Sequence, residues 1–190
     1  MEMPMLLKRD CHRLVVAVAL VSLDPAGAAD STPGQPVELA CPAVAPARCT
    51  MRFSGAYTGR LDCEAALLVM GSQSNIAITV ARNSNAGIDA GGTFGIEGPI
   101  KLDQTYTYAN LQLATGNFKF ERAEIPVIWW AKSPSDSVPA VGSMALRICS
   151  TKQRSEAPMP LYEVHGVARI TYDPLLQAGG TASIVSQISF

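Results

Sequence analysis

After residue 50, short stretches of apolar or alternating apolar and polar residues are separated by clusters of Gly, Pro, Asn, Ser and Asp. Alternation with a period of two is typical of half-buried β-strands, and many short strands with turn signals between them favour a sandwich or a closed barrel. The run AALLVM could be helical by propensity, but its short length and its hairpin-like neighbour IAITVAR favour a strand. The predicted strands are MRFSGAYTG, EAALLVMGS, IAITVAR, TFGIEG, TYTYANLQL, EIPVIWWAK, VGSMALRICS, LYEVHGVARITYD and TASIVSQISF.

The stretch YEVHGVARITY, residues 162–172, shows the alternation most clearly and contains the histidine His165. Successive side chains of a strand point to opposite faces, so His165 shares the more polar face with Glu163 and Arg169. We therefore expect His165 on the solvent side of the strand. The packed inward face is expected to carry Tyr162, Val164, Gly166, Ala168, Ile170 and Tyr172.

A catalytic role for His165 would require a serine and an acid that converge on it. Glu163 lies two positions away on the same face, but no Gly-x-Ser-x-Gly sequence nominates a nucleophile. Because a catalytic site needs several converging groups, we predict that the chain has no catalytic residue. A secreted hydrolase that uses His165 is the alternative.

The N-terminal segment, residues 1–29, has the composition of a secretory signal peptide. Basic residues precede the apolar run LVVAVALVSL, which at ten residues is shorter than the roughly 20 that a membrane-spanning helix needs. We predict export to the periplasm, the cell surface or the extracellular space, with no transmembrane segment in the mature chain. Residues 30–50, rich in Pro and Ala, are predicted to be an extended lead-in to a β-domain at residues 51–190.

Four cysteines remain after the predicted signal peptide: Cys41, Cys49, Cys63 and Cys149. An even number of cysteines in an exported chain predicts disulfides, and four cysteines allow three connectivities. We favour a small clip between Cys41 and Cys49 and a long-range bridge between Cys63 and Cys149. The closest pair has seven residues between its members, wider than the Cys-x₂₋₄-Cys pairs of zinc sites, so no metal site is predicted. The predicted fold is thus an all-β, two-sheet antiparallel β-sandwich stapled by disulfides.

The charges of the chain nearly cancel, with a formal net charge of −1 and no run of like sign. Nucleic-acid binding needs a clustered basic footprint, and binding to anionic membranes needs one too. The pattern therefore argues against nucleic acid as a partner and gives no support for binding to anionic membranes. No residue pattern indicates a cofactor.

The aromatic residues supply a ligand hypothesis. In TYTYANLQL, Tyr106 and Tyr108 alternate with an apolar face, so we expect both tyrosines outside the core. Trp129 and Trp130 must point to opposite faces, and Trp130 shares its side with Lys132. Exposed rings beside amides suit the apolar faces and hydroxyls of sugars. Tyr106, Tyr108 and Trp130 are therefore candidate carbohydrate-binding residues, although aromatic side chains are also common in strands for packing alone.

The segment NSNAGIDAGG, residues 83–92, carries side-chain oxygens at Asn83, Asn85 and Asp89 between glycines. Calcium sites usually include more than one carboxylate, and only Asp89 is charged here. We therefore expect a polar turn, because Asn and Gly tolerate positive φ.

The C-terminal run TASIVSQISF has alternating apolar residues and ends in Phe190. Such an ending is similar to the closing strand of outer-membrane barrels, but those barrels need lipid-facing alternation of about 10 residues in every strand. Several of the predicted strands are shorter. We therefore expect a soluble sandwich with Phe190 on the core face, and a small outer-membrane barrel is the alternative.

Several sequence features occur together: FSGAYTGRLDC, the tryptophan of IWWAK, the strand G-x-M-A-L-R-I, and VHGVARITYDPLL before a last strand that ends in Phe. Over most of residues 51–190 this combination resembles a group of small exported bacterial β-sandwich proteins of unknown function. In that group a His-Gly pair opens the penultimate strand, matched here by His165 and Gly166. The resemblance implies the fold and export, and it implies no activity. We therefore predict an exported non-catalytic binding or structural module whose partner is a glycan or another cell-surface component.

Overall fold

The computed structural model describes residues 38–70, 73–79, 87–102, 104–120, 128–135, 137–153, 161–175 and 182–190. In these residues all regular secondary structure is β, which confirms the predicted all-β class. The predicted signal peptide lies outside the described residues. The strands are β1 (Cys49–Gly55), β2 (Gly59–Met70), β3 (Gln73–Thr79), β4 (Ile88–Glu97), β5 (Thr105–Thr107), β6 (Leu113–Phe120), β7 (Ile128–Lys132), β8 (Ser143–Gln153), β9 (Leu161–Pro174) and β10 (Ile184–Ser189).

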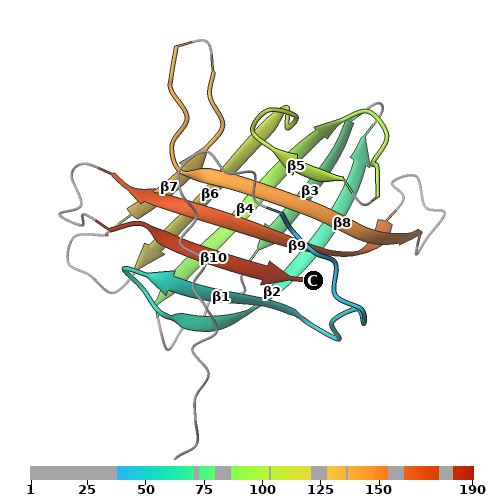
Figure 1. Ribbon diagram of the computed structural model, residues 1–190, viewed down its shortest axis with the longest axis horizontal. Coiled ribbons are helices and arrows are strands. Elements are labelled where there is room, and N and C mark those ends of the chain that lie inside the picture. Colours follow the sequence, from blue (N-terminus) through green and yellow to red (C-terminus); the bar gives the residue numbers. More distant parts are fainter. Residues whose placement is uncertain are drawn as a thin grey trace, which may run out of the picture. The chain divides into compact units, whose positions relative to one another are not determined.

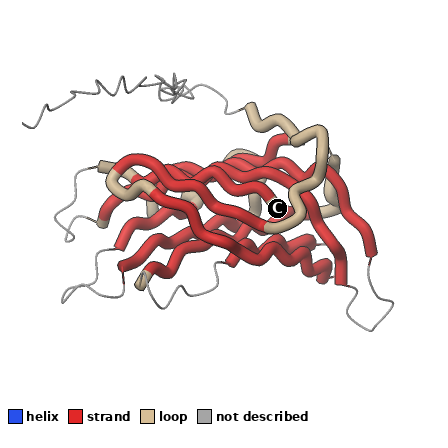
Figure 2. The backbone as a smooth tube through the Cα atoms, turned by 90° about the horizontal axis from the view of Figure 1, so that it is seen from below, coloured by secondary structure: helices blue, strands red, loops and turns tan. Residues whose placement is uncertain are grey.

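The strands form two layers. In Figure 1, β8, β9, β10 and β1 lie in front of β3, β4 and β6 and run in a different direction, and Figure 2 shows the layers from the side. All pairings are antiparallel, in the order β10-β1-β2-β3-β4-β6-β7-β9-β8-β5. β2 pairs with β1 through its first part and with β3 through the rest, so it passes from one layer to the other. β9 additionally pairs with β10 and β2. The predicted sandwich is confirmed, and strand pairing joins its layers.

The inner face of β9 fills the space between the layers. Ile170 and Tyr172, both on the predicted inward face, are fully buried. They lie against Gly92 and Gly116, which are directly opposite each other across β4 and β6. A Cβ at Gly92 would lie 2.6 Å from Ile170 Cδ1, and one at Gly116 would lie 3.1 Å from Tyr172 Cε1. Glycine at these two positions therefore allows the layers to approach closely.

The end of the chain is held against β9. The backbone N–H of Gly166 donates to the carbonyl of Phe190 at 2.7 Å, and the N–H of Phe190 donates back to Gly166 at 3.0 Å. A Cβ at Gly166 would lie 2.8 Å from Phe190 Cζ, so the ring occupies the space that a side chain would need. The ring is buried, which confirms the expected place of Phe190 on the core face.

Two predicted elements differ in the structure. The segment LATGNFKF forms β6, which the sequence did not predict because Gly116 and Asn117 are unfavourable in strands. The predicted strand TYTYANLQL is β only over Thr105–Thr107, and a turn follows at residues 108–110. Asn110 closes this turn, since its side-chain oxygen accepts the N–H of Thr107 at 2.6 Å.

The disulfide connectivity favoured from the sequence is wrong. The bonds join Cys41 to Cys149 and Cys49 to Cys63. Cys49 and Cys63 are directly opposite each other across β1 and β2, with their Cα atoms 4.9 Å apart. The register of the strand pair, which spacing along the chain does not reveal, thus sets this bond. Disulfides of this kind persist in oxidising compartments.

The second disulfide ties the predicted lead-in to β8. Cys41 and Cys149 are 108 positions apart in the sequence, and their Cα atoms are 5.8 Å apart. Arg147, two residues before Cys149, donates from Nη1 to the carbonyl of Leu39 at 2.8 Å. The described part of the lead-in is therefore fixed to the outer side of β8 at two points.

Candidate functional site

Trp130 is the one candidate ligand-binding aromatic that the structure leaves well exposed. In β7, Trp129 is 5% exposed and Trp130 is 42% exposed, so the two rings lie on opposite faces as predicted. The indole N–H of Trp129 donates to the carbonyl of Ala182 at 3.1 Å. This buried neighbour anchors the strand from which Trp130 projects.

Polar residues and glycine surround Trp130 on the outer face of β4, β6 and β7. Asn117 is directly opposite Trp130, and Gly91 is directly opposite Asn117. The adjacent row consists of Lys132, Thr115 and Thr93, in the same strand order. We call these six residues the Trp130 face: Trp130, Asn117, Gly91, Lys132, Thr115 and Thr93.

The shape of the Trp130 face follows from this register. Neighbouring strands are about 4.8 Å apart, so the Asn117 amide stands one strand away from the Trp130 ring. Gly91, one strand further, has no side chain and is buried. The face therefore combines an exposed ring, an amide, two threonine hydroxyls and an ammonium group.

Tyr106 is not at the surface, which corrects the expectation from the sequence. It is 3% exposed, and its hydroxyl accepts the N–H of Lys101 at 2.7 Å. The expectation failed because strand alternation was carried through the turn that follows Thr107. Leu111 is consequently buried and Leu113 is 48% exposed, although the alternation placed both on one face.

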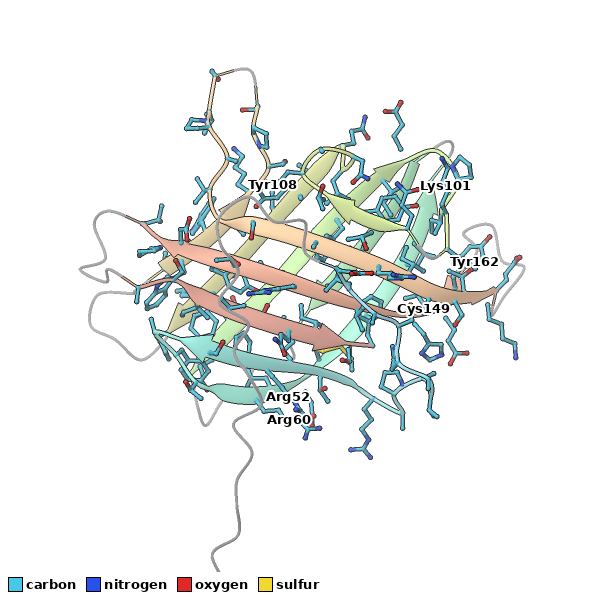
Figure 3. The ribbon with its side chains drawn as sticks, viewed as in Figure 1. Arg52, Arg60, Lys101, Tyr108, Cys149 and Tyr162 are labelled. Atoms are coloured by element: carbon cyan, nitrogen blue, oxygen red, sulfur yellow. A yellow bond between two sulfur atoms is a disulfide. The ribbon has the colours of Figure 1, made fainter. Side chains whose placement is uncertain are left out.

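Tyr108 has a structural role. It is half-buried, and its hydroxyl donates to the carbonyl of Val141 at 3.0 Å, at the junction of β7 and β8 (Figure 3). Burial, and to a smaller extent the carboxylate of Asp173, raises the pKa of Tyr108 well above its ordinary value. The hydroxyl therefore stays protonated and keeps this hydrogen bond at neutral pH. Tyr106 and Tyr108 do not join Trp130 in an exposed row of rings.

Asp173, at the end of β9, is bound by two loops. One carboxylate oxygen accepts the N–H of Gly142 at 2.9 Å, and the other accepts the hydroxyl of Ser183 at 2.7 Å. These bonds connect the start of β8 and the segment before β10 to β9. Asp173 therefore has a structural role, because its two hydrogen bonds hold these loops against β9.

His165 lies on the outer face of β9, as predicted, with its side chain 28% exposed. Its Nε2 is 3.6 Å from Glu163 Oε1, and Ser150 of β8 is directly opposite in the register. Nδ1 is buried and has no hydrogen-bond partner in the part of the chain that the structure describes. A Ser-His-acid site needs a serine hydroxyl bonded to the imidazole. That bond does not occur among the described residues, so His165 and Glu163 form a pair rather than a triad.

The predicted polar turn at residues 83–92 is only partly described. Asn83 and Asn85 lie outside the described residues, and from Ile88 onward the chain is the strand β4 rather than a turn. Asp89 is opposite Lys119 of β6. Within the described ranges, no group of three or more His, Cys, Asp or Glu residues could hold a metal ion.

Comparisons with protein-family models, curated proteins and solved structures give no match. The class of protein is therefore defined by the structure alone: an all-β sandwich with two disulfides and an exposed tryptophan on a polar sheet face. In the described residues no helix is long and apolar enough to cross a membrane. Sequence reasoning identified Trp130 but missed Asn117 and Gly91, because it did not recognise β6 as the strand beside β7.

Proposed function

We propose that this protein is an exported, non-catalytic binding module that holds carbohydrate on the Trp130 face. The observation that carries the proposal is the 42% exposed ring of Trp130 on a face that is otherwise polar. An indole ring costs free energy when water covers it, and a pyranose ring offers an apolar face of similar size. The exposed ring is therefore explained by a ligand that stacks on it.

The neighbours of Trp130 suit the remaining groups of a sugar. The Asn117 amide both donates and accepts hydrogen bonds, which is what sugar hydroxyls require. The hydroxyls of Thr115 and Thr93 add further partners in the adjacent row. Because these groups project from paired strands, they lose little conformational freedom on binding.

Export is supported by two features. The two disulfides fit an oxidising compartment, and residues 1–29 have the pattern of a signal peptide. The resemblance to small exported β-sandwich proteins agrees with this location. The ligand would then be a glycan or another sugar-bearing component of a cell surface.

The hydrolase alternative finds less support. Glu163 accompanies His165, but no serine hydroxyl in the described part of the chain is bonded to the imidazole. Trp130 lies opposite Asp173 near the end of β9, whereas Glu163 and His165 lie near its start. Binding without turnover is the simpler function for this arrangement.

A glycan array with the purified mature protein tests the proposal. For the glycan that binds, Trp130→Ala is expected to weaken affinity by about tenfold or more, because truncating a central aromatic anchor costs more than 1 kcal/mol. Asn117→Ala is expected to weaken it less, since one hydrogen bond contributes about 0.5–1.5 kcal/mol.

Leu102→Ala is the matched control, because Leu102 is also an exposed apolar residue, 49% exposed, outside the Trp130 face. It should leave affinity unchanged. Absence of glycan binding by the intact protein, or an equal loss in the Trp130 and Leu102 variants, would rule out this site.

A further inference from the structure

Asp173 lies directly opposite Trp130, where β7 pairs with the end of β9. Side chains that are directly opposite in an antiparallel pair lie on the same face, with their Cβ atoms about 4.5–5.5 Å apart. Tyr172 is fully buried, so the next residue, Asp173, points outward, and it is partly exposed. A carboxylate therefore borders the Trp130 ring on the side away from Asn117.

The Asp173 carboxylate is held in place and still has room for donors. One oxygen accepts the N–H of Gly142 at 2.9 Å, and the other accepts the hydroxyl of Ser183 at 2.7 Å. The Gly142 backbone also lies beside Trp130, because a Cβ added at Gly142 would be 3.2 Å from the Trp130 carbonyl oxygen. A carboxylate oxygen can accept two hydrogen bonds, so each oxygen has one acceptor position left.

The charge of Asp173 favours a neutral ligand beside the ring. Among the described residues, no Lys or Arg forms an ion pair with Asp173. A sugar carboxylate or sulfate next to it would meet a like charge, whereas a sugar hydroxyl would donate a charge-assisted hydrogen bond. Lys132, in the adjacent row of the Trp130 face, favours an anion instead, and an acidic sugar is therefore included in the test below.

We propose that Asp173 completes the sugar site, and that the ligand is a glycan with a neutral pyranose residue in which two adjacent hydroxyls are free. While the pyranose stacks on Trp130, each of these hydroxyls donates to one oxygen of the carboxylate. Hydroxyls on neighbouring carbons have a spacing similar to that of the two oxygens, so both bonds form together. The Asn117 amide bonds the opposite edge of the same residue. This inference rests on the function proposed above and adds which sugars the Trp130 face selects.

The test measures binding of methyl glycosides of glucose, mannose and galactose to the full mature protein by calorimetry, together with their monodeoxy analogues. For the glycoside that binds, loss of either of two adjacent hydroxyls should weaken affinity by about tenfold or more, as for hydrogen bonds to a charged group. Loss of a hydroxyl elsewhere on the ring should weaken it less. The methyl glucuronide should bind no more tightly than the methyl glucoside.

The variant Asp173→Asn keeps the size of the side chain and removes its charge and one acceptor oxygen. It should weaken binding of the intact glycoside by about tenfold or more, and binding of the analogue that lacks one hydroxyl of the pair by clearly less. A purely structural role of Asp173 would reduce binding of both ligands equally. Ser183→Ala is the matched control, because it removes a bond to the carboxylate but leaves the carboxylate itself, and its effect on affinity should be small. If Asp173→Asn does not fold, the deoxy series with the natural chain decides by itself.

Trp130→Ala separates this inference from the proposed function. Weaker binding by Trp130→Ala together with equal binding of all deoxy analogues would overturn the role of Asp173 and leave carbohydrate binding in place. Equal losses of the intact and deoxy glycosides in Asp173→Asn, tighter binding of the glucuronide, or no binding of any of these glycosides would also overturn it. Binding on the glycan array that survives Trp130→Ala would overturn both proposals.

Discussion

Gly92 has a hydrogen atom at the position where any other residue would have a Cβ, and that Cβ would lie against the opposite layer. The site lies within 2.6 Å of Ile170 Cδ1 and 3.2 Å of Met144 Cε, measured from the position of an added Cβ. Interiors are packed to crystal-like density, so even one extra methyl group needs a rearrangement. A larger residue at position 92 would therefore require the packing between the two layers to change.

Gly92→Ala is expected to destabilise the protein by about 1–3 kcal/mol, as for other overpacked core sites. The cause is the contact of the new Cβ with Ile170 Cδ1. Urea unfolding followed by tryptophan fluorescence would measure the change in the free energy of unfolding.

Ile170→Val provides the control for this prediction, because it deletes Cδ1 and costs about 0.5–1.5 kcal/mol by itself. The double variant should be more stable than the sum of the single costs implies, since the valine makes room for the alanine. Strictly additive costs would show that the contact with Ile170 is not the cause.

Among the elements, the β1–β2 pair contains two directly opposed arginines, Arg52 and Arg60. Arg52→Glu would convert the like-charged pair with Arg60 into a cross-strand ion pair. We expect stability to rise by about 0.2–1 kcal/mol, measured as a higher urea midpoint. A rise in stability would show that the like charges of Arg52 and Arg60 repel each other across β1 and β2.

The charge-swapped variant Arg52→Glu/Arg60→Glu restores a like-charged pair, now negative. Its stability should return to about that of the natural chain. If Arg52→Glu alone leaves stability unchanged or lowers it, the opposed arginines do not strain the strand pair.

β6 shows that a segment can form a strand because of its neighbouring strands even when its own residues have weak strand propensity. Its sequence LATGNFKF has weak strand propensity, but it pairs with β4 on one side and β7 on the other. Gly116 fits closely there, because an added Cβ would lie only 3.1 Å from Tyr172 Cε1. The packing of the opposite layer outweighs local propensity, as often happens in central strands.

On the scale of the whole molecule, the two disulfides close loops of very different length. Cys41 and Cys149 are 108 positions apart, whereas Cys49 and Cys63 are 14 apart. In the chain-entropy view, a longer closed loop restricts the unfolded chain more. Replacement of Cys41 and Cys149 by Ala should therefore cost about 4–5 kcal/mol, and replacement of Cys49 and Cys63 about 3 kcal/mol.

Urea unfolding of both double-alanine variants, with the intact disulfide confirmed by mass, would measure this difference. Reduction of the natural chain should destabilise it at least as much as the more damaging replacement. A larger cost for the Cys49 and Cys63 variant would mean that the tether of the lead-in to β8 contributes little.

The sequence by itself determined which side chains of a strand point inward and which point outward, because this depends only on the alternation along that strand. The alternation along residues 162–172 placed Ile170 and Tyr172 inward and His165 outward, and the pattern of IWWAK separated Trp129 from Trp130. Such assignments succeed because successive side chains of any strand point to opposite faces, whatever the neighbouring strands are. The same rule failed for Tyr106, where a turn interrupted the period.

Only the tertiary structure decided which residues stand next to each other across strands. It placed Cys49 beside Cys63, Asn117 beside Trp130, and Arg60, Arg52, Gln187 and Arg169 in one row. These neighbours come from distant parts of the chain, and their contact depends on strand order and register, which are set by the packing of the whole core.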